Sequence, residues 1–121
     1  MAVRILIIED DSSIQLFMHM ALSGEGYEVA VAVNGADALA KLSTFHPHVI
    51  FMDLFMPRMN GQEFLHNYYA IPGPKAAVIV LSAANNIDKL ATVVHADGFL
   101  PKPFNINAML AMVEQYTAGA V

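Results

Sequence analysis

Hydrophobic residues alternate between two patterns along the whole chain. Short, mostly β-branched apolar runs predict buried strands, and longer stretches with apolar residues three and four positions apart predict amphipathic helices. The predicted strands cover residues 3–8, 27–33, 49–52, 76–81 and 98–100, and a predicted helix follows each one. Because such helices can return the chain to begin a parallel strand, the pattern predicts one α/β domain over residues 1–121, with a βα unit repeated five times.

The first predicted helix carries two apolar surfaces. One stripe at helical spacing predicts its core face, and Asp11 or Ser12 is the expected N-cap. Leu16 and Met20 lie off that stripe and predict an exposed apolar patch. The patch is either a face that docks a partner or a consequence of leucine and methionine being good helix formers. The core stripe consists of Ile14, Phe17, Met18, Ala21 and Leu22.

Similar stripes predict the later helices. Asn34 is the expected N-cap of the second helix, which runs to about Phe45. Glu28 in the second strand and Pro101 directly after the fifth strand both suit the edges of a sheet. The tail after Tyr116 is expected to fray. The predicted core faces of the fourth and fifth helices are Ile87, Leu90, Ala91 and Val94, and Ile106, Met109, Leu110 and Val113.

Composition narrows the classes of function. The chain has a net charge of −5 and no cysteine, and 56% of its residues are hydrophobic while 14% are charged. The negative charge argues against direct nucleic-acid binding, and the lack of cysteine is compatible with a reducing, cytoplasmic location. No apolar run approaches the ~18 residues that span a bilayer, so neither a membrane segment nor a signal peptide is expected. The apolar excess favours a module that binds other proteins.

Acidic residues follow two of the predicted strands directly. Glu9, Asp10 and Asp11 come after the first strand, and Asp53 comes after the third. Because ligands bind outside the carboxyl ends of parallel strands, these acids should converge at one end of the sheet. Crowded carboxylates repel one another unless a cation neutralises them, and Mg²⁺ suits such an oxygen-rich site. Asp11 fits better as an acid at a helix N-terminus, where the helix dipole favours it.

A hydroxyl and an ammonium complete the predicted site. Ser82 follows the fourth strand, and Lys102 lies just past the fifth strand between two prolines. Asp53 could serve as another metal ligand or as a nucleophile, because carboxylates attack phosphorus to form aspartyl phosphates. Ser82 could donate a hydrogen bond to a phosphoryl oxygen, and Lys102 could donate a charge-assisted one.

Taken together, these segments resemble the receiver domain of two-component response regulators. The matching segments are Ile-Ile-Glu-Asp at 7–10, Met-Asp-Leu-Phe-Met-Pro-Arg-Met-Asn-Gly at 52–61, Val-Leu-Ser-Ala at 80–83 and Lys-Pro-Phe at 102–104. Their order and spacing match the family over nearly the whole chain. The resemblance implies a flavodoxin-like, doubly wound parallel sheet with strand order 2-1-3-4-5.

The resemblance also implies roles for individual residues. Asp53 would accept a phosphoryl group from a histidine kinase or a histidine phosphotransfer protein. Ser82 and Lys102 would bind that group, and Phe99 stands where the family has an aromatic side chain that moves with the switch. The Lys102–Pro103 peptide bond is expected to be cis. The implied Mg²⁺ ligands are Glu9, Asp10, Asp53 and the backbone carbonyl of Phe55.

The function implied is a phosphorylation-dependent switch rather than an enzyme. Its altered face would be the fourth helix, fifth strand and fifth helix, read by a downstream protein or by an attached output domain. A phosphorylation-dependent dimer is left open. The main alternative is a pseudo-receiver that is never phosphorylated and acts as a protein–protein interaction module. A small phosphatase-like hydrolase would usually need a second acid two residues after Asp53, where this chain has Phe55.

Overall fold

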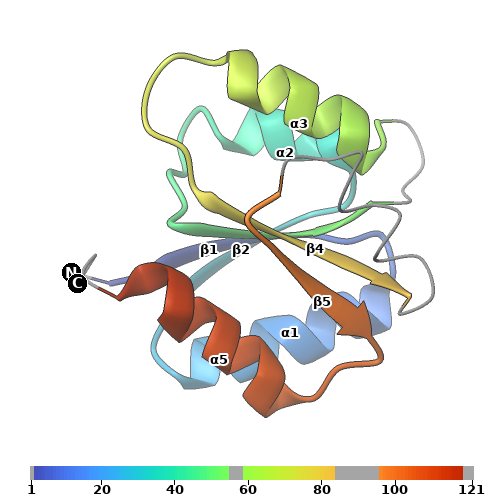
Figure 1. Cartoon of the computed structure of the whole chain (residues 1–121), viewed down its shortest axis with the longest axis vertical. Coiled ribbons are helices and arrows are strands. Elements are labelled where there is room, and N and C mark those ends of the chain that lie inside the picture. Colours follow the sequence, from blue (N-terminus) through green and yellow to red (C-terminus); the bar gives the residue numbers. More distant parts are fainter. Residues whose placement is uncertain (1, 55–58, 84–95, 119–121) are drawn as a thin grey trace.

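The computed structural model of the chain describes residues 2–54, 59–83 and 96–118. Five strands and four helices are described, and Figure 1 shows their arrangement. The predicted fourth helix, with Ile87, Leu90, Ala91 and Val94, lies outside the described residues. In chain order the elements are β1 (Arg4–Ile8), α1 (Ser12–Gly24), β2 (Glu28–Ala32), α2 (Gly35–Lys41), β3 (Val49–Asp53), α3 (Gly61–Ala70), β4 (Ala77–Ala83), β5 (Gly98–Lys102) and α5 (Ile106–Thr117).

The five strands form one parallel sheet in the order β2-β1-β3-β4-β5. This confirms the predicted fold class and places β2 and β5 at the edges. Figure 1 shows α1 and α5 on one side of the sheet and α2 and α3 on the other. Alternate residues of β1 therefore belong to different cores. Ile5 and Ile7 pack with α1 and α5, whereas Leu6 and Ile8 pack with α2 and α3.

Polar caps fix where the described helices begin. The Asp11 carboxylate accepts the backbone N–H groups of Ser13 at 2.9 Å and Ile14 at 3.1 Å. The predicted cap Asn34 accepts the Asp37 N–H at 2.8 Å. Asn60 caps α3 in the same way. These bonds satisfy backbone donors that have no partner within the helix, so each cap sets the residue at which its helix starts.

Several predicted positions differ from the structure. Phe17 is 40% exposed and Ile106 is 42% exposed, so neither belongs to the core face to which it was assigned. Both lie at the margin of an otherwise buried stripe, and the Phe17 ring contacts that of Phe104 at a centroid distance of 6.1 Å. Helix α2 ends at Lys41 rather than near Phe45. Thr117 does not fray, because it is buried and its hydroxyl donates to the Val113 carbonyl at 2.6 Å.

The edge strand β5 runs two residues beyond its predicted end. It includes Pro101, which pairs in register with Ser82 of β4. Proline is tolerated here because an edge strand needs hydrogen bonds on one side only. The patch predicted on α1 is confirmed as exposed, since Leu16 is 60% and Met20 65% accessible. Within the described ranges, no helix has both the length and the apolar character required to cross a membrane.

Candidate metal and phosphoryl site

Four strands deliver the predicted site residues to one end of the sheet. Glu9 and Asp10 follow β1, Asp53 is the last residue of β3, and Lys102 is the last residue of β5. Ser82 lies in β4, one residue past Leu81, which is paired with Asp53. The carboxyl ends of parallel strands lie at the same end of the sheet, so residues far apart in sequence meet here.

Three carboxylates gather closely enough to share a cation. One oxygen from each of Glu9, Asp10 and Asp53 lies within 4.8 Å of the others. The Glu9 side chain is fully buried, and its Oε2 has no hydrogen-bond partner among the described residues. A buried carboxylate oxygen without a partner is costly, and a hard cation with oxygen ligands would satisfy it. The donor set therefore fits Mg²⁺. Phe55, whose carbonyl is the other predicted ligand, lies outside the described residues.

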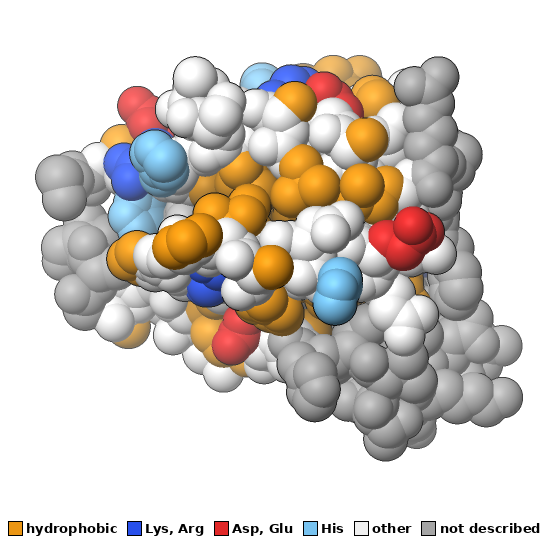
Figure 2. All heavy atoms as spheres, turned by 90° about the horizontal axis from the view of Figure 1, so that it is seen from above, with side chains coloured by type: hydrophobic (Ala, Val, Ile, Leu, Met, Phe, Trp, Pro, Cys, Tyr) orange, Lys and Arg blue, Asp and Glu red, His pale blue; other side chains and the backbone are white. Residues whose placement is uncertain are grey.

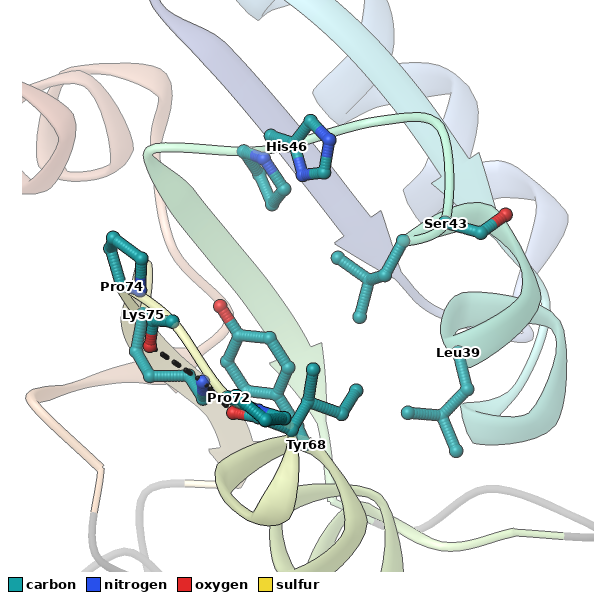
Figure 3. A pocket seen from close by; sticks show the side chains of 11 residues that line it. Leu39, Ser43, His46, Tyr68, Pro72, Pro74 and Lys75 are labelled. Atoms are coloured by element: carbon teal, nitrogen blue, oxygen red, sulfur yellow. Dashed lines mark hydrogen bonds between the residues drawn. The ribbon is translucent and has the colours of Figure 1, made fainter.

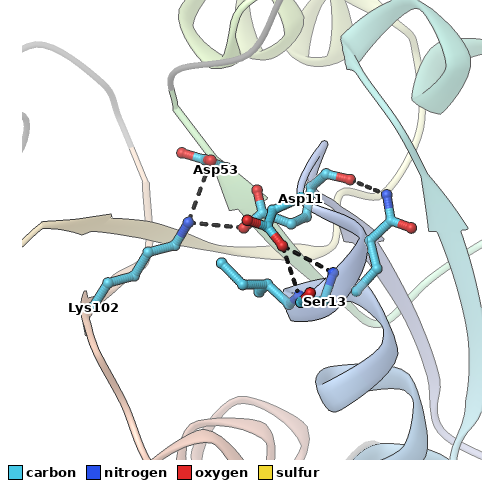
Figure 4. Close-up of polar contacts among 7 residues, drawn as sticks. Asp11, Ser13, Asp53 and Lys102 are labelled. Atoms are coloured by element: carbon cyan, nitrogen blue, oxygen red, sulfur yellow. Dashed lines mark hydrogen bonds and ion pairs between the residues drawn. The ribbon is translucent and has the colours of Figure 1, made fainter.

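Lys102 bridges two of these acids. Its Nζ is 2.8 Å from Glu9 Oε1 and 3.3 Å from Asp53 Oδ2, as Figure 4 shows for the contact with Asp53. Burial alone would lower the pKa of Lys102, but its hydrogen bond to Glu9 and the charge of Asp53 raise that pKa above its ordinary value. The lysine is therefore a fixed positive charge beside Asp53, and it is not the solvated surface residue that a lone lysine usually is.

The pKa of Glu9 is raised above its ordinary value. Burial is the main cause that raises its pKa to about 7, and the neighbouring carboxylate of Asp53 acts in the same direction. The hydrogen bond and charge of Lys102 oppose this shift. Because a protonated carboxyl cannot serve as an anionic ligand, a cation bound at this site would favour the charged form of Glu9.

Ser82 and Phe99 lie on the two strands beside the acids. Ser82 is 3% exposed, and its hydroxyl has no partner in the part of the chain that the structure describes. A buried hydroxyl without a partner is available to bond a new group at Asp53. Phe99 is half-buried opposite Val80 and packs against the core on the α2 and α3 side. The Lys102–Pro103 peptide bond is cis.

The loop that carries Glu9 and Asp10 is held by hydrogen bonds to β2 on one side and to α1 on the other. The Glu9 N–H donates to the Ala32 carbonyl at 3.0 Å, which anchors the loop to β2. The Gln15 side-chain amide donates to the Glu9 carbonyl from the first turn of α1. Asp11 caps α1, as its predicted role requires. Gln15 was not among the predicted site residues, because one polar residue on a helix carries no signal of what it touches.

An apolar pocket of about 330 Å³ opens beside Lys102. It lies between α1 and the loop that joins β5 to α5. The lining residues are Ile14, Phe17, Lys102, Pro103 and Phe104.

Comparisons with known proteins agree with this geometry. The family model for the response regulator receiver domain matches residues 5–114. The response regulator MprA of Mycobacterium bovis is 32% identical over 113 residues, which are 92% of this chain and 49% of that protein. The chain thus spans about half the length of the curated relatives it matches.

Solved structures show the same fold. The signal receiver domain of a response regulator from Bermanella marisrubri superposes with a TM-score of 0.84 at 28% identity, covering 97% of this chain and 99% of that one. The receiver domain of a signal transduction histidine kinase from Syntrophus aciditrophicus gives a TM-score of 0.86 at 26% identity, covering 98% and 92% of the two chains. The fold is therefore shared with domains that occur in both kinds of signalling protein.

Proposed function

Because the chain belongs to the response regulator receiver family, whose members are signalling domains rather than enzymes in the ordinary sense, we propose that Asp53 is its phosphoacceptor. The phosphoryl group comes from a phosphohistidine on a histidine kinase or on a phosphotransfer protein, in the cytoplasm. The observation that carries this proposal is the meeting of Glu9, Asp10 and Lys102 around Asp53. One oxygen of each acid lies within 4.8 Å of the others, and the Lys102 Nζ is 3.3 Å from Asp53 Oδ2.

The transfer is a simple displacement at phosphorus. An oxygen of Asp53 forms the new P–O bond while the P–N bond of the phosphohistidine breaks, and the electron pair of that bond stays on the histidine nitrogen. Phosphoryl transfer needs positioning and charge neutralisation more than covalent help. Glu9 and Asp10 would hold Mg²⁺, which supplies charge neutralisation when bound. Lys102 then gives up its contact with Asp53 and donates to a phosphoryl oxygen.

The same transfer sets the switch. A phosphoryl group adds a charge of about −1.5 to −2 and three acceptor oxygens at Asp53. The buried hydroxyl of Ser82, which has no partner among the described residues, is drawn to one of those oxygens. Phe99 then fills the space that Ser82 leaves, and the surface of β5 and α5 changes with it. This surface is read by a downstream protein or by an attached output domain.

The exposed patch on α1 is proposed as the face that docks the phosphodonor. Leu16 and Met20 are the two most exposed large hydrophobic side chains on that helix, and α1 begins directly after the acids. Exposed apolar patches of this kind mark interaction sites more often than isolated apolar residues do.

Mass spectrometry tests the phosphoacceptor directly. Wild type and Asp53→Asn are incubated with acetyl phosphate, with Mg²⁺ and again with a chelator. We expect one added phosphoryl group in the wild type with Mg²⁺ and none in the variant or with the chelator. A folded wild type that gains nothing would favour the pseudo-receiver, with surface docking as the whole function. Addition to both proteins would mean that the acceptor is another residue.

A further inference from the structure

A second pocket lies at the opposite end of the sheet from Asp53. Its walls come from the end of α2, the loop before β3, the end of α3 and the loop before β4 (Figure 3). The pocket volume is about 450 Å³, which is within the range of roughly 300–1,000 Å³ typical of small-molecule sites. Pro47 lines it two residues before β3, and Asp53 ends that strand, so the two sites are roughly 20 Å apart.

One side of the pocket is apolar. Leu39 and Leu42 line it from α2 and the turn that follows, and Ile71 lines it from the end of α3. The Tyr68 ring, which is 6% exposed, lies on the α3 side. Figure 2 looks onto the α2 and α3 side of the molecule and shows hydrophobic side chains gathered across the middle of this face. These walls suit the body of an apolar ligand.

The other side carries hydrogen-bond donors. The Lys75 ammonium donates to the carbonyls of Ile71 and Gly73, the latter at 2.9 Å, and lies 5.4 Å from the centroid of the Tyr68 ring. An ammonium has three protons, so one remains for a ligand. His46 lines the same pocket, and Figure 2 shows histidine and other basic side chains gathered towards the left of this face.

The charge of Lys75 is not balanced locally. Lys41 and Lys102 each contact a carboxylate, but no carboxylate of a described residue lies within 4.0 Å of the Lys75 ammonium. The Tyr68 hydroxyl accepts the Ala76 N–H at 2.8 Å, which leaves its own proton to donate. Burial raises the pKa of Tyr68 and outweighs the hydrogen bond from Ala76, which lowers it, while the charge of Asp97 adds to the rise. The proton is therefore retained at neutral pH.

We propose that this pocket binds a small amphipathic anion, namely a carboxylate carried on an aromatic or branched aliphatic body. The carboxylate accepts hydrogen bonds from Lys75, His46 and the Tyr68 hydroxyl, and the body packs against Leu39, Leu42 and Ile71. The pocket needs no phosphorylation to form, so this site stands whether or not Asp53 is the phosphoacceptor.

A titration of the unmodified protein tests the proposal. Backbone amide shifts of isotope-labelled protein are followed by NMR with para-methylbenzoate, with its uncharged analogue para-methylbenzamide, and with acetate. We expect saturable shifts at residues lining the pocket with para-methylbenzoate. Binding of the amide and of acetate should each be weaker by about tenfold or more, because one lacks the charge and the other the apolar body. Equal binding of the acid and the amide would overturn the proposal, as would shifts spread over the whole protein.

A pair of lysine variants locates the anion. Lys75→Met removes the unbalanced ammonium but keeps the length of the side chain, and Lys41→Met removes an ammonium outside the pocket as the matched control. We expect affinity for para-methylbenzoate to fall about tenfold in Lys75→Met and to stay within about twofold in the control. Unchanged affinity in Lys75→Met would overturn the proposal. The comparison of para-methylbenzoate with para-methylbenzamide uses the unmodified protein. It therefore tests the proposal even if Lys75→Met disturbs the loop.

Discussion

Glu9 is the residue whose titration the fold changes most clearly. Its pKa rises from an ordinary value of 4.5 to about 7, chiefly through burial. Between these two values the folded protein binds more protons than the unfolded chain, so stability falls as the pH rises. The raised pKa of Lys102 acts in a different window, because its contribution is lost only above the ordinary lysine value of 10.5.

The free energy of unfolding in Mg²⁺-free buffer should therefore fall between pH 4.5 and about 7. The expected loss from Glu9 is roughly 1–3 kcal/mol, since each pKa unit corresponds to about 1.4 kcal/mol. Urea unfolding at several pH values measures it. The Glu9→Gln variant cannot titrate at this position and should show a flatter profile. Identical profiles for the variant and the wild type would show that Glu9 is not the group responsible.

Gln15 should act as a positioning residue for the acids. Its amide holds the Glu9 carbonyl, but it contributes no ligand itself. Gln15→Met keeps the length of the side chain and removes this hydrogen bond. Residues that hydrogen-bond to metal ligands typically change metal affinity by about 10–100-fold, so we expect Mg²⁺ to bind about tenfold more weakly.

An Mg²⁺ titration followed by NMR measures the effect of Gln15→Met. Gln62→Met, at an exposed glutamine on α3, is the control and should leave Mg²⁺ affinity unchanged. Unchanged affinity in Gln15→Met would mean that the other bonds of the loop suffice to hold Glu9.

At the residue scale, the sequence predicted which charged groups would meet but not how the fold supports them. Glu9, Asp53 and Lys102 each follow or end an apolar strand, and parallel topology then brings them together. The contact between Gln15 and Glu9 depends on the angle at which α1 leaves the loop, which no residue pattern specifies. The sequence likewise did not indicate that Lys102 contacts two acids, Glu9 and Asp53, at once.

At the scale of elements, Gly61 lets the start of α3 pack closely against Leu54, the residue that follows Asp53. A Cβ at this position would lie 2.9 Å from both Cα and Cδ1 of Leu54. The Gly61 N–H also donates to the Leu54 carbonyl at 2.9 Å. A side chain here would therefore push against backbone directly after Asp53.

We expect Gly61→Ala to destabilise the protein by about 1–3 kcal/mol, in the range of other overpacking substitutions. Gly24→Ala is the matched control, because a Cβ there meets no atom within 4 Å among the described residues. Since Gly24 lies in α1, alanine should leave stability unchanged or raise it by up to about 1 kcal/mol. Thermal unfolding of both variants measures this. Equal effects would show that the close approach at Gly61 is relieved by a small shift of α3.

The order and type of the described elements could be predicted because strand and helix patterns differ in period. The exact ends of these elements, and the residues at the borders of their buried faces, could not be predicted in the same way. The stripe on α1 was assigned five core positions, yet Phe17 is 40% exposed, because it lines the open pocket between α1 and the loop that joins β5 to α5. The end of β5 was placed before Pro101, and the strand continues through it because one side of an edge needs no partner.

At the scale of the whole molecule, different regions of the surface have different proposed functions. The carboxyl end of the sheet holds Asp53, α1 presents apolar side chains beside it, and β5 with α5 forms the surface that the switch alters. The order of the strands follows from the family resemblance rather than from hydrophobic pattern, which does not fix how parallel strands are arranged. The small-anion pocket at the other end had no signal in the sequence, because its lining comes from separate segments.

This division predicts a variant that separates docking from chemistry. Leu16→Ser combined with Met20→Ser removes the two most exposed apolar side chains of α1 without touching the buried face. Because both residues are more than half exposed, stability should change by less than about 0.5 kcal/mol for each substitution. Phosphorylation by acetyl phosphate should proceed at the wild-type rate, since this donor needs no protein surface. Transfer from a phosphohistidine protein that phosphorylates the wild type should slow about tenfold or more, because the donor loses an apolar contact.

The matched control for this experiment is Ile71→Ser, which removes an exposed apolar side chain far from Asp53. It should leave both rates unchanged. Equal slowing with acetyl phosphate and with the protein donor would place the defect of the double variant in the site itself. Wild-type rates with both donors would mean that the phosphodonor approaches Asp53 over another face. The leucine and methionine would then be in α1 because they favour helix formation, the alternative that the sequence left open.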